Sequence, residues 1–246
     1  MKIYLGIQHV RDIGVSPPNS VSLRQIMDRK SRWPDKSDWF LDSGAFTFIT
    51  DFCGYPISIQ EYKETLTAHN PTLWSTLDYP CEEICTYATG ADVTQHIDWT
   101  TENSQRLIDF RDGFVHVIQG RSLEDYLYAV DQAKSLGLLT PLTGLGTLCR
   151  RNNVPTILYL LKEIRKVIPS NIALHGFGIK KTVLRYKEAY ETLSSIDTYA
   201  WNFERFHRIY FPDTAEWRHE TLKRYRRELE SLEKAAQTTQ SKLMVE

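Results

Sequence analysis

The stretch of sequence that decides the fold is Trp39-Phe40-Leu41-Asp42-Ser43-Gly44-Ala45-Phe46. Its first three residues are apolar and predict a short buried strand, while the acid and the glycine that follow predict a turn into a helix. The same order, a short apolar strand ending on an acid, an amide or a glycine, recurs at six of seven candidate strands. These strands are 3–7, 39–42, 73–78, 114–119, 139–144, 172–177 and 196–200.

Helical stretches separate these strands. Two segments, Ser58-Ile59-Gln60-Glu61 and Ser122-Leu123-Glu124-Asp125, predict capping boxes at helix starts. A long charged helix is expected from about residue 215 to 235. Strand and helix alternate along the chain, which favours an α/β fold, a (β/α)8 TIM-type barrel. The eighth strand is expected near 206–211 or in the first forty residues, and a doubly wound sheet is the alternative.

Composition places the chain among ordinary globular proteins. Of its 246 residues, 41% are hydrophobic and 25% are charged. We expect one domain over 1–246, with a helix and tail from about 212 to 246. No apolar run approaches the roughly 18 residues that span a bilayer, so we expect no membrane contact. Four irregularly spaced cysteines do not form a disulfide framework, and we therefore predict a cytoplasmic protein.

The net charge of −1 hides an asymmetry between the two halves of the chain. Residues 1–140 contain 12 Lys and Arg against 19 Asp and Glu, whereas residues 141–246 contain 18 against 12. Solvated helix faces account for any single basic cluster, but the regional excess favours a polyanion as partner. The candidate nucleic-acid-binding residues are Arg150, Arg151, Lys180, Lys181, Arg205 and Arg208.

Two acids and one amide fall at predicted strand ends, namely Asp42, Asp78 and Gln119, and a third acid, Asp197, falls on or just after the seventh strand. In a parallel barrel these ends meet at one face, where functional residues are expected. Two carboxylates that face each other across a sugar can break the bond at its anomeric carbon, one as nucleophile and one as proton carrier. A third carboxylate fits the N1–H and 2-amino donors of guanine, and an amide fits its O6. The same groups also suit a metal or a sugar phosphate.

The order of these motifs resembles the tRNA-guanine transglycosylase superfamily, a (β/α)8 barrel family. The resemblance covers about residues 38–202 and includes Asp42-Ser43-Gly44-Ala45-Phe46, Gln119-Gly120 and the late Asp197. The runs 144–151 and 197–201 are closer to the DNA-guanine transglycosylases, which insert 7-deazaguanines into bacterial or phage DNA. For a phage-encoded protein, the expected location is the host cytoplasm.

The resemblance implies a role for each of these residues. Asp197 would be the nucleophile on C1′ of the sugar, and Asp42 would be the acid/base that handles the proton of the base. Asp78 would hold N1–H and the amino group of the base. The remaining base-binding residues would be Gln119 and Gly144 on O6, Phe46 as a stacking ring, and Gly120, His175 and Gly176 in the pocket wall.

The chain departs from the tRNA enzymes in ways that bear on its substrate. It has no cysteine after Cys149, so their zinc site is absent, and Ala45 replaces the second glycine of their motif. We expect no metal and no cofactor. The sequence thus predicts a glycosyltransferase that exchanges guanine in DNA for a 7-deazaguanine such as preQ0 through a covalent Asp intermediate.

Other functions and partners remain open at this point. A tRNA-guanine transglycosylase, a non-catalytic nucleic-acid-binding subunit and an unrelated barrel enzyme on a phosphorylated sugar are the alternatives. The expected partners are DNA and the free 7-deazaguanine base. The terminal helix leaves a homodimer open, and the resemblance alone suggests enzymes that supply or edit the base.

Overall fold

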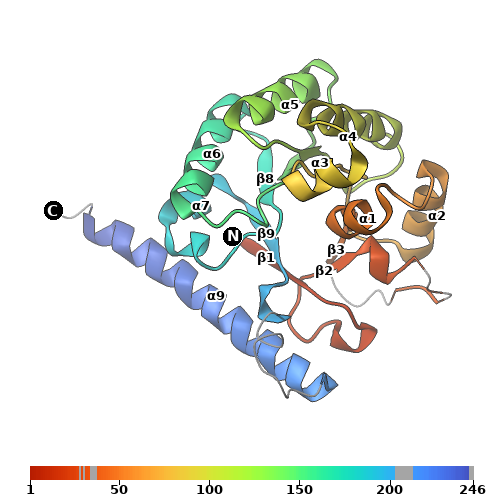
Figure 1. Ribbon diagram of the computed structural model, residues 1–246. Helices are drawn as coiled ribbons and strands as arrows, with labels where there is room; N and C mark the ends of the chain where they lie inside the picture. Colours follow the sequence, from red (N-terminus) through yellow and green to blue (C-terminus); the bar gives the residue numbers. More distant parts are fainter. Residues whose placement is uncertain (28, 30, 34–37, 203–212, 244–246) are drawn as a thin grey trace.

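A computed structural model describes residues 1–27, 29, 31–33, 38–202 and 213–243 of the chain. Within them a parallel sheet closes into a barrel that is surrounded by helices (Figure 1). The sheet order is β5-β4-β3-β2-β1-β9-β8-β7-β6. The strands are β1 (Lys2–Gly6), β2 (Asn19–Ser22), β3 (Trp39–Asp42), β4 (Leu73–Ser75), β5 (Phe114–Val115), β6 (Val117–Ile118), β7 (Leu142–Leu145), β8 (Ala173–Gly176) and β9 (Ser195–Thr198).

The barrel closes through one interrupted strand. The two ends of the sheet, β5 and β6, are separated in sequence only by His116. On one side β5 pairs with β4, and on the other β6 pairs with β7. The main chain of His116 bridges the interruption, because its carbonyl accepts a hydrogen bond from the Gly144 amide at 2.7 Å. Counting 114–118 as one strand gives the eight strands of the predicted TIM-type barrel, and the doubly wound alternative is wrong.

All seven predicted strands are present, and the eighth is β2 in the first forty residues. It pairs in parallel with both β1 and β3. Its Asn19 is buried and donates to the carbonyls of Leu5 and Ser16, both at 3.3 Å, which stabilises a polar strand inside the wall. The other position considered for this strand, 206–211, lies outside the described residues.

The helices follow the strands as the alternation predicts. Both predicted capping boxes are confirmed. The side chains of Ser58 and Ser122 each accept from the backbone amide three residues on, and the backbone amide of each serine donates to the acidic side chain at that position. The helices are α1 (Ala45–Phe52), α2 (Ile59–His69), α3 (Glu83–Thr89), α4 (Val93–Leu107), α5 (Leu123–Ser135), α6 (Val154–Val167), α7 (Lys187–Thr192) and α9 (Ala215–Leu243).

An aromatic cluster fills the interior of the barrel. Tyr4 and Phe40 are fully buried, and the ring of Phe40 lies 4.9 Å from that of His175. His175 in turn lies 4.6 Å from Phe177, whose ring is edge-on to it. These packed rings lie in the barrel interior and support the strand ends on which the polar side chains lie.

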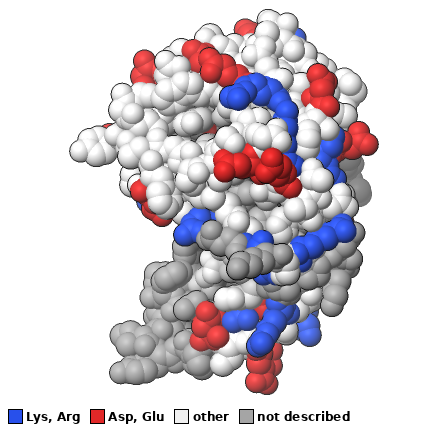
Figure 2. Space-filling view, turned by 90° about the vertical axis from the view of Figure 1, so that its right-hand side faces the viewer, with Lys and Arg blue, Asp and Glu red and all other residues white. Residues whose placement is uncertain are grey.

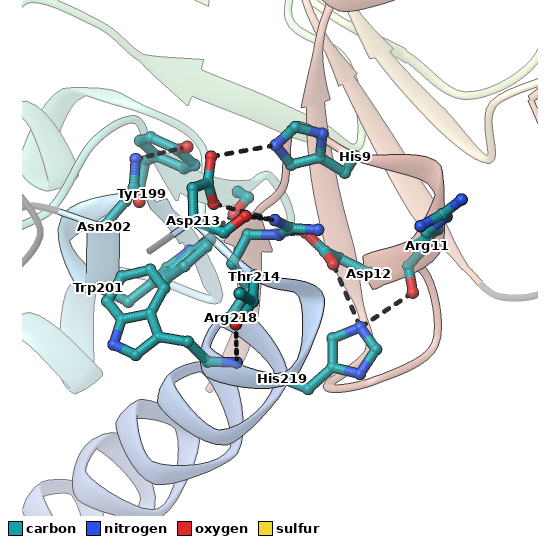
Figure 3. Close-up of polar contacts among 12 residues, drawn as sticks. His9, Arg11, Asp12, Tyr199, Trp201, Asn202, Asp213, Thr214, Arg218 and His219 are labelled. Carbon is teal, nitrogen blue, oxygen red and sulfur yellow. Dashed lines mark hydrogen bonds and ion pairs between the residues drawn. The ribbon is translucent and has the colours of Figure 1, made fainter. Parts of the chain in front are cut away.

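The long helix α9 lies against the outside of the barrel (Figure 1). Ion pairs of its residue Arg218 hold it there. Figure 3 shows Arg218 between two acids: it donates to Asp12 at 2.7 Å and to Asp213 at 2.9 Å. His219 lies 3.2 Å from the other Asp12 oxygen. Arg218 thus forms an ion pair with a carboxylate that is completely buried beside the short helix η1 (Val10–Asp12).

Replacing Arg218 with Ala should destabilise the fold strongly. The Asp12 side chain has no exposed area, so the change leaves an unpaired buried charge, which costs about 3 kcal/mol. Urea unfolding at neutral pH measures this loss in the free energy of unfolding. Arg227→Ala, an exposed change on the same helix, is the control and should have little effect. A loss below about 0.5 kcal/mol for Arg218→Ala would contradict this role.

Candidate active site

A cavity of about 430 Å³ opens at the carboxyl ends of the strands. We call it the central cavity. Residues at or just after all eight barrel strands line it, the expected location for function in a parallel barrel. They include Ser22, Asp42, Asp78, Gln119, Gly146, Phe177, Gly178 and Asp197. The four predicted polar residues, from four separate strand ends, therefore share one cavity.

The turn after β3 positions the first acid. Gly44 has a left-handed backbone (φ +70°), and its amide donates to Asp42 Oδ2 at 3.0 Å. A Cβ atom on Gly44 would lie 2.6 Å from the Ser22 hydroxyl, so the close approach of β2 also requires glycine here. The neighbouring Ser43 hydroxyl donates to Asp78 Oδ1 at 2.6 Å. This single turn thereby positions two of the three acids.

The environment of Asp42 favours its neutral form. Burial, together with the nearby negative charges of Asp197 and Asp78, raises the pKa of Asp42 to about 8, against the effect of the Gly44 hydrogen bond. Asp42 is therefore protonated at neutral pH. A carboxyl with a pKa near the working pH can both donate and accept a proton.

Asp78 and Gln119 form a hydrogen-bonded pair in the cavity wall. The Gln119 amide nitrogen donates to Asp78 Oδ2 at 2.5 Å, and its oxygen accepts from the Thr147 hydroxyl at 2.5 Å. Burial raises the pKa of Asp78 to about 6, while the hydrogen bonds from Ser43 and Gln119 oppose the rise. Asp78 is thus mostly ionised at pH 7 and presents acceptors, and Gln119 keeps a second N–H donor.

Asp197 lies at the end of β9 with 17% of its side chain exposed. The amide of Gly178 donates to Asp197 Oδ1 at 2.7 Å. The buried His175 ring lies behind it, with Nε2 at 3.7 Å from the same oxygen and Nδ1 at 2.9 Å from the Ser195 hydroxyl. These contacts orient the carboxylate toward the cavity.

The other predicted base-binding residues lie in different places. Phe46, in the first turn of α1, lines the central cavity. Gly144 lies within the barrel wall: its amide pairs with His116, and a Cβ there would come 2.4 Å from the Phe177 ring. His175 is fully buried beneath Asp197. Gly120 and Gly176 pack closely against Tyr126 and Ile179, respectively, and none of these four residues is among those that line the cavity.

Many residues that line the cavity were not predicted as site residues, and Glu82, Thr147, Gly178 and Tyr199 are four of them. Thr147 has an unusual left-handed backbone (φ +53°), and its hydroxyl both donates to Gln119 and accepts from the Cys81 amide. Burial raises the pKa of Glu82, which accepts from the Cys149 thiol at 3.4 Å. The only available signal was proximity in sequence, since each residue lies within five positions of a predicted strand end.

The candidate nucleic-acid-binding residues are only partly available. Arg151 donates to the carbonyls of Thr147 and Arg121 at 2.8 and 2.6 Å, so it holds loops together. The guanidinium of Arg150 lies 5.1 Å from the Phe46 ring, at the rim of the cavity. Lys180 donates to Asn152, and Lys181 forms an ion pair with Glu228. Arg205 and Arg208 lie outside the described residues.

The surface does not carry one continuous basic face in the view of Figure 2, where Lys and Arg are interspersed with Asp and Glu. Among the described residues, no group of three His, Cys, Asp or Glu side chains is arranged to hold a metal ion. The helices of the described part of the chain are too short or too polar to cross a membrane.

A closed parallel barrel with three acids and an amide around one cavity defines a TIM-barrel enzyme of the transglycosylase type. The chain matches the sequence model of the family "DpdA: DeoxyPurine in DNA protein A" over residues 1–238, and it belongs to that family. This is a family of DNA-guanine transglycosylases, related to the tRNA-guanine transglycosylases, that insert deazapurines into DNA. A comparison with curated proteins gave no match.

Proposed function

We propose that the central cavity exchanges guanine in DNA for a 7-deazaguanine base such as preQ0 through a covalent ester on Asp197. The convergence of Asp42, Asp78 and Asp197 on one cavity carries this proposal. The target nucleotide must first leave the helical stack, because neither C1′ nor the base edge is accessible inside it. The free deazaguanine is the second substrate.

In the first half of the reaction a carboxylate oxygen of Asp197 attacks C1′. The bond between C1′ and N9 breaks, and its electron pair leaves with guanine. Asp42, protonated at neutral pH because its pKa is about 8, donates its proton to the departing base at N9. The product of this half is a glycosyl ester on Asp197 and a free guanine.

In the second half the entering base takes the place of guanine. Asp42, now a carboxylate, accepts the N9 proton of the deazaguanine, and N9 attacks C1′. The ester bond breaks, Asp197 is released as a carboxylate, and the proton is back on Asp42. The two inversions at C1′ retain the configuration of the sugar, and the cycle consumes no cofactor.

Asp78 and Gln119 are proposed to hold both bases. The Asp78 oxygens accept from N1–H and the 2-amino group, and the second N–H of Gln119 donates to O6. The amide of Gly144 is already used between strands, so we leave it out of this set. Phe46 lies at the rim, where its ring can stack on the base.

Labelled guanine tests the function directly. The protein is incubated with the labelled base and either DNA or tRNA, and label in each polymer is counted. Incorporation into DNA alone supports the proposal. Label in tRNA alone would instead make the chain a tRNA-guanine transglycosylase, and label in neither would favour a non-catalytic subunit or another substrate.

Asp78→Asn should impair recognition of the base. Its amide places N–H donors opposite the donors of guanine, so the rate of guanine exchange should fall about ten- to a hundredfold at limiting base. The measurement is the exchange rate against the concentration of free guanine. Asp131→Asn, an exposed change on α5, is the matched control. Equally fast exchange by Asp78→Asn would show that Asp78 does not hold the base edge.

A further inference from the structure

A second pocket of about 600 Å³ adjoins the central cavity. We call it the α3 pocket, because three residues of α3 contribute to its wall. It shares Glu82 and Thr147 with the central cavity, so the two are neighbours on one surface. The α3 pocket is lined by Cys81, Glu82, Glu83, Ile84, Tyr87, Arg121, Thr147, Arg150 and Arg151.

The most exposed large apolar side chain in the described part of the chain lies here. Tyr87 is 88% exposed, and Ile84, one helical turn before it, is 49% exposed. Exposed aromatic rings are costly in water, and a flat ring beside a nucleic-acid site is a platform for a base. Both side chains lie on α3, which packs against α1 (Figure 1).

The α3 pocket is also lined by positively charged side chains that hydrogen bonds hold in place. Arg121 donates from Nε to the Cys81 carbonyl at 3.0 Å and from Nη2 to the Thr86 hydroxyl at 2.8 Å. Arg151 is held by carbonyls in the same way, through Nε and Nη2. A guanidinium has five N–H donors, and these contacts of Arg121 use only Nε and Nη2, so its Nη1 can donate to an anion. The three arginines outnumber the two glutamates of the lining, and an anion is therefore favoured.

We propose that the α3 pocket binds the nucleotide next to the target guanine in the same DNA strand. The base of that neighbour stacks on Tyr87, and its phosphate contacts Arg121, Arg150 and Arg151. This inference rests on the proposed function, because extrusion of guanine into the central cavity removes a stacking partner from the adjacent base. Tyr87 replaces that partner, and the shared wall places the two nucleotides side by side.

Binding of a short single-stranded oligonucleotide with one guanine tests the inference without chemistry. Tyr87→Ala should raise its Kd, and its KM in exchange, about tenfold, since base–aromatic stacking contributes on this scale. Tyr87→Phe should bind like the wild type because it retains the ring. Tyr159→Ala is the control, since Tyr159 is 54% exposed on α6 and lines neither pocket. An unchanged Kd for Tyr87→Ala would overturn the inference.

An abasic site beside the guanine supplies a second, independent test. If Tyr87 stacks on the neighbouring base, an abasic site on either the 5′ or the 3′ side of the guanine should weaken wild-type binding as much as Tyr87→Ala does. The two changes together should then be no worse than either alone. If the losses in binding from Tyr87→Ala and from the abasic site were fully additive on both sides of the guanine, the inference would be overturned. A wild type that binds DNA with this pattern yet exchanges no guanine would count against the proposed function instead.

Discussion

An Asp197→Asn variant should bind DNA and form no covalent adduct with it. The amide cannot supply the carboxylate oxygen that attacks C1′, so guanine exchange should fall at least about a thousandfold. Denaturing electrophoresis of the protein with labelled DNA, quenched during turnover, measures the adduct. The Gly178 amide that donates to Asp197 can still donate to the amide oxygen, so the variant should retain its fold.

The control for this experiment is Asp131→Asn, which makes the same chemical change on α5 at an exposed side chain. It should form the adduct and exchange guanine at the wild-type rate. An adduct of normal yield with Asp197→Asn would assign the nucleophile to another residue. Asp42 would then be the candidate, since it is the other acid that faces the sugar in the proposed reaction.

Asp42→Asn should change both the rate and its dependence on pH. In the wild type the acid form of Asp42 is present below its pKa of about 8 and is lost above it. The single-turnover rate of adduct formation should therefore be high at pH 6 to 7 and should fall as the pH rises through about 8. The variant has no such proton, so its rate should be about a hundred- to ten-thousandfold lower and nearly independent of pH in this range.

The stability of the variant supplies a further check on the same group. Because the folded-state pKa of Asp42 is raised above that of the unfolded chain, its ionisation destabilises the folded state as the pH rises toward 8. Asp42→Asn should thus raise the melting temperature more at pH 8.5 than at pH 4. If the fall in rate above pH 8 persisted in the variant, another group would be responsible for it.

The barrel and the convergence of the four polar residues followed from sequence because both obey simple rules. Short apolar strands alternate with helices along the chain, and the carboxyl ends of parallel strands lie together at one face of the barrel. The rule was enough for Asp42, Asp78, Gln119 and Asp197. It did not locate β2, since Asn19 and Ser20 are polar residues whose burial depends on hydrogen bonds to distant carbonyls.

Details that depend on backbone conformation were beyond the sequence. The left-handed Thr147 and the amide of Gly178 orient Gln119 and Asp197, yet neither residue type indicates such a role. The sequence also did not reveal that the Gly144 amide, predicted to contact O6, donates to the His116 carbonyl. The carbonyl partners of Arg151, which hold two loops together, were likewise not evident from the sequence.

The pairing of Asp78 with Gln119 has a consequence for the direction of the reaction. Guanine and its 7-deaza analogues present the same N1–H, amino and O6 atoms, so in the proposed reaction these two residues would hold the outgoing and the incoming purine equally. Since an enzyme leaves the equilibrium of its reaction unchanged, the stability of the two DNA products and the abundance of the free purines then decide which purine enters. Preference for the modified product must come from atoms around position 7, on the far rim of the ring.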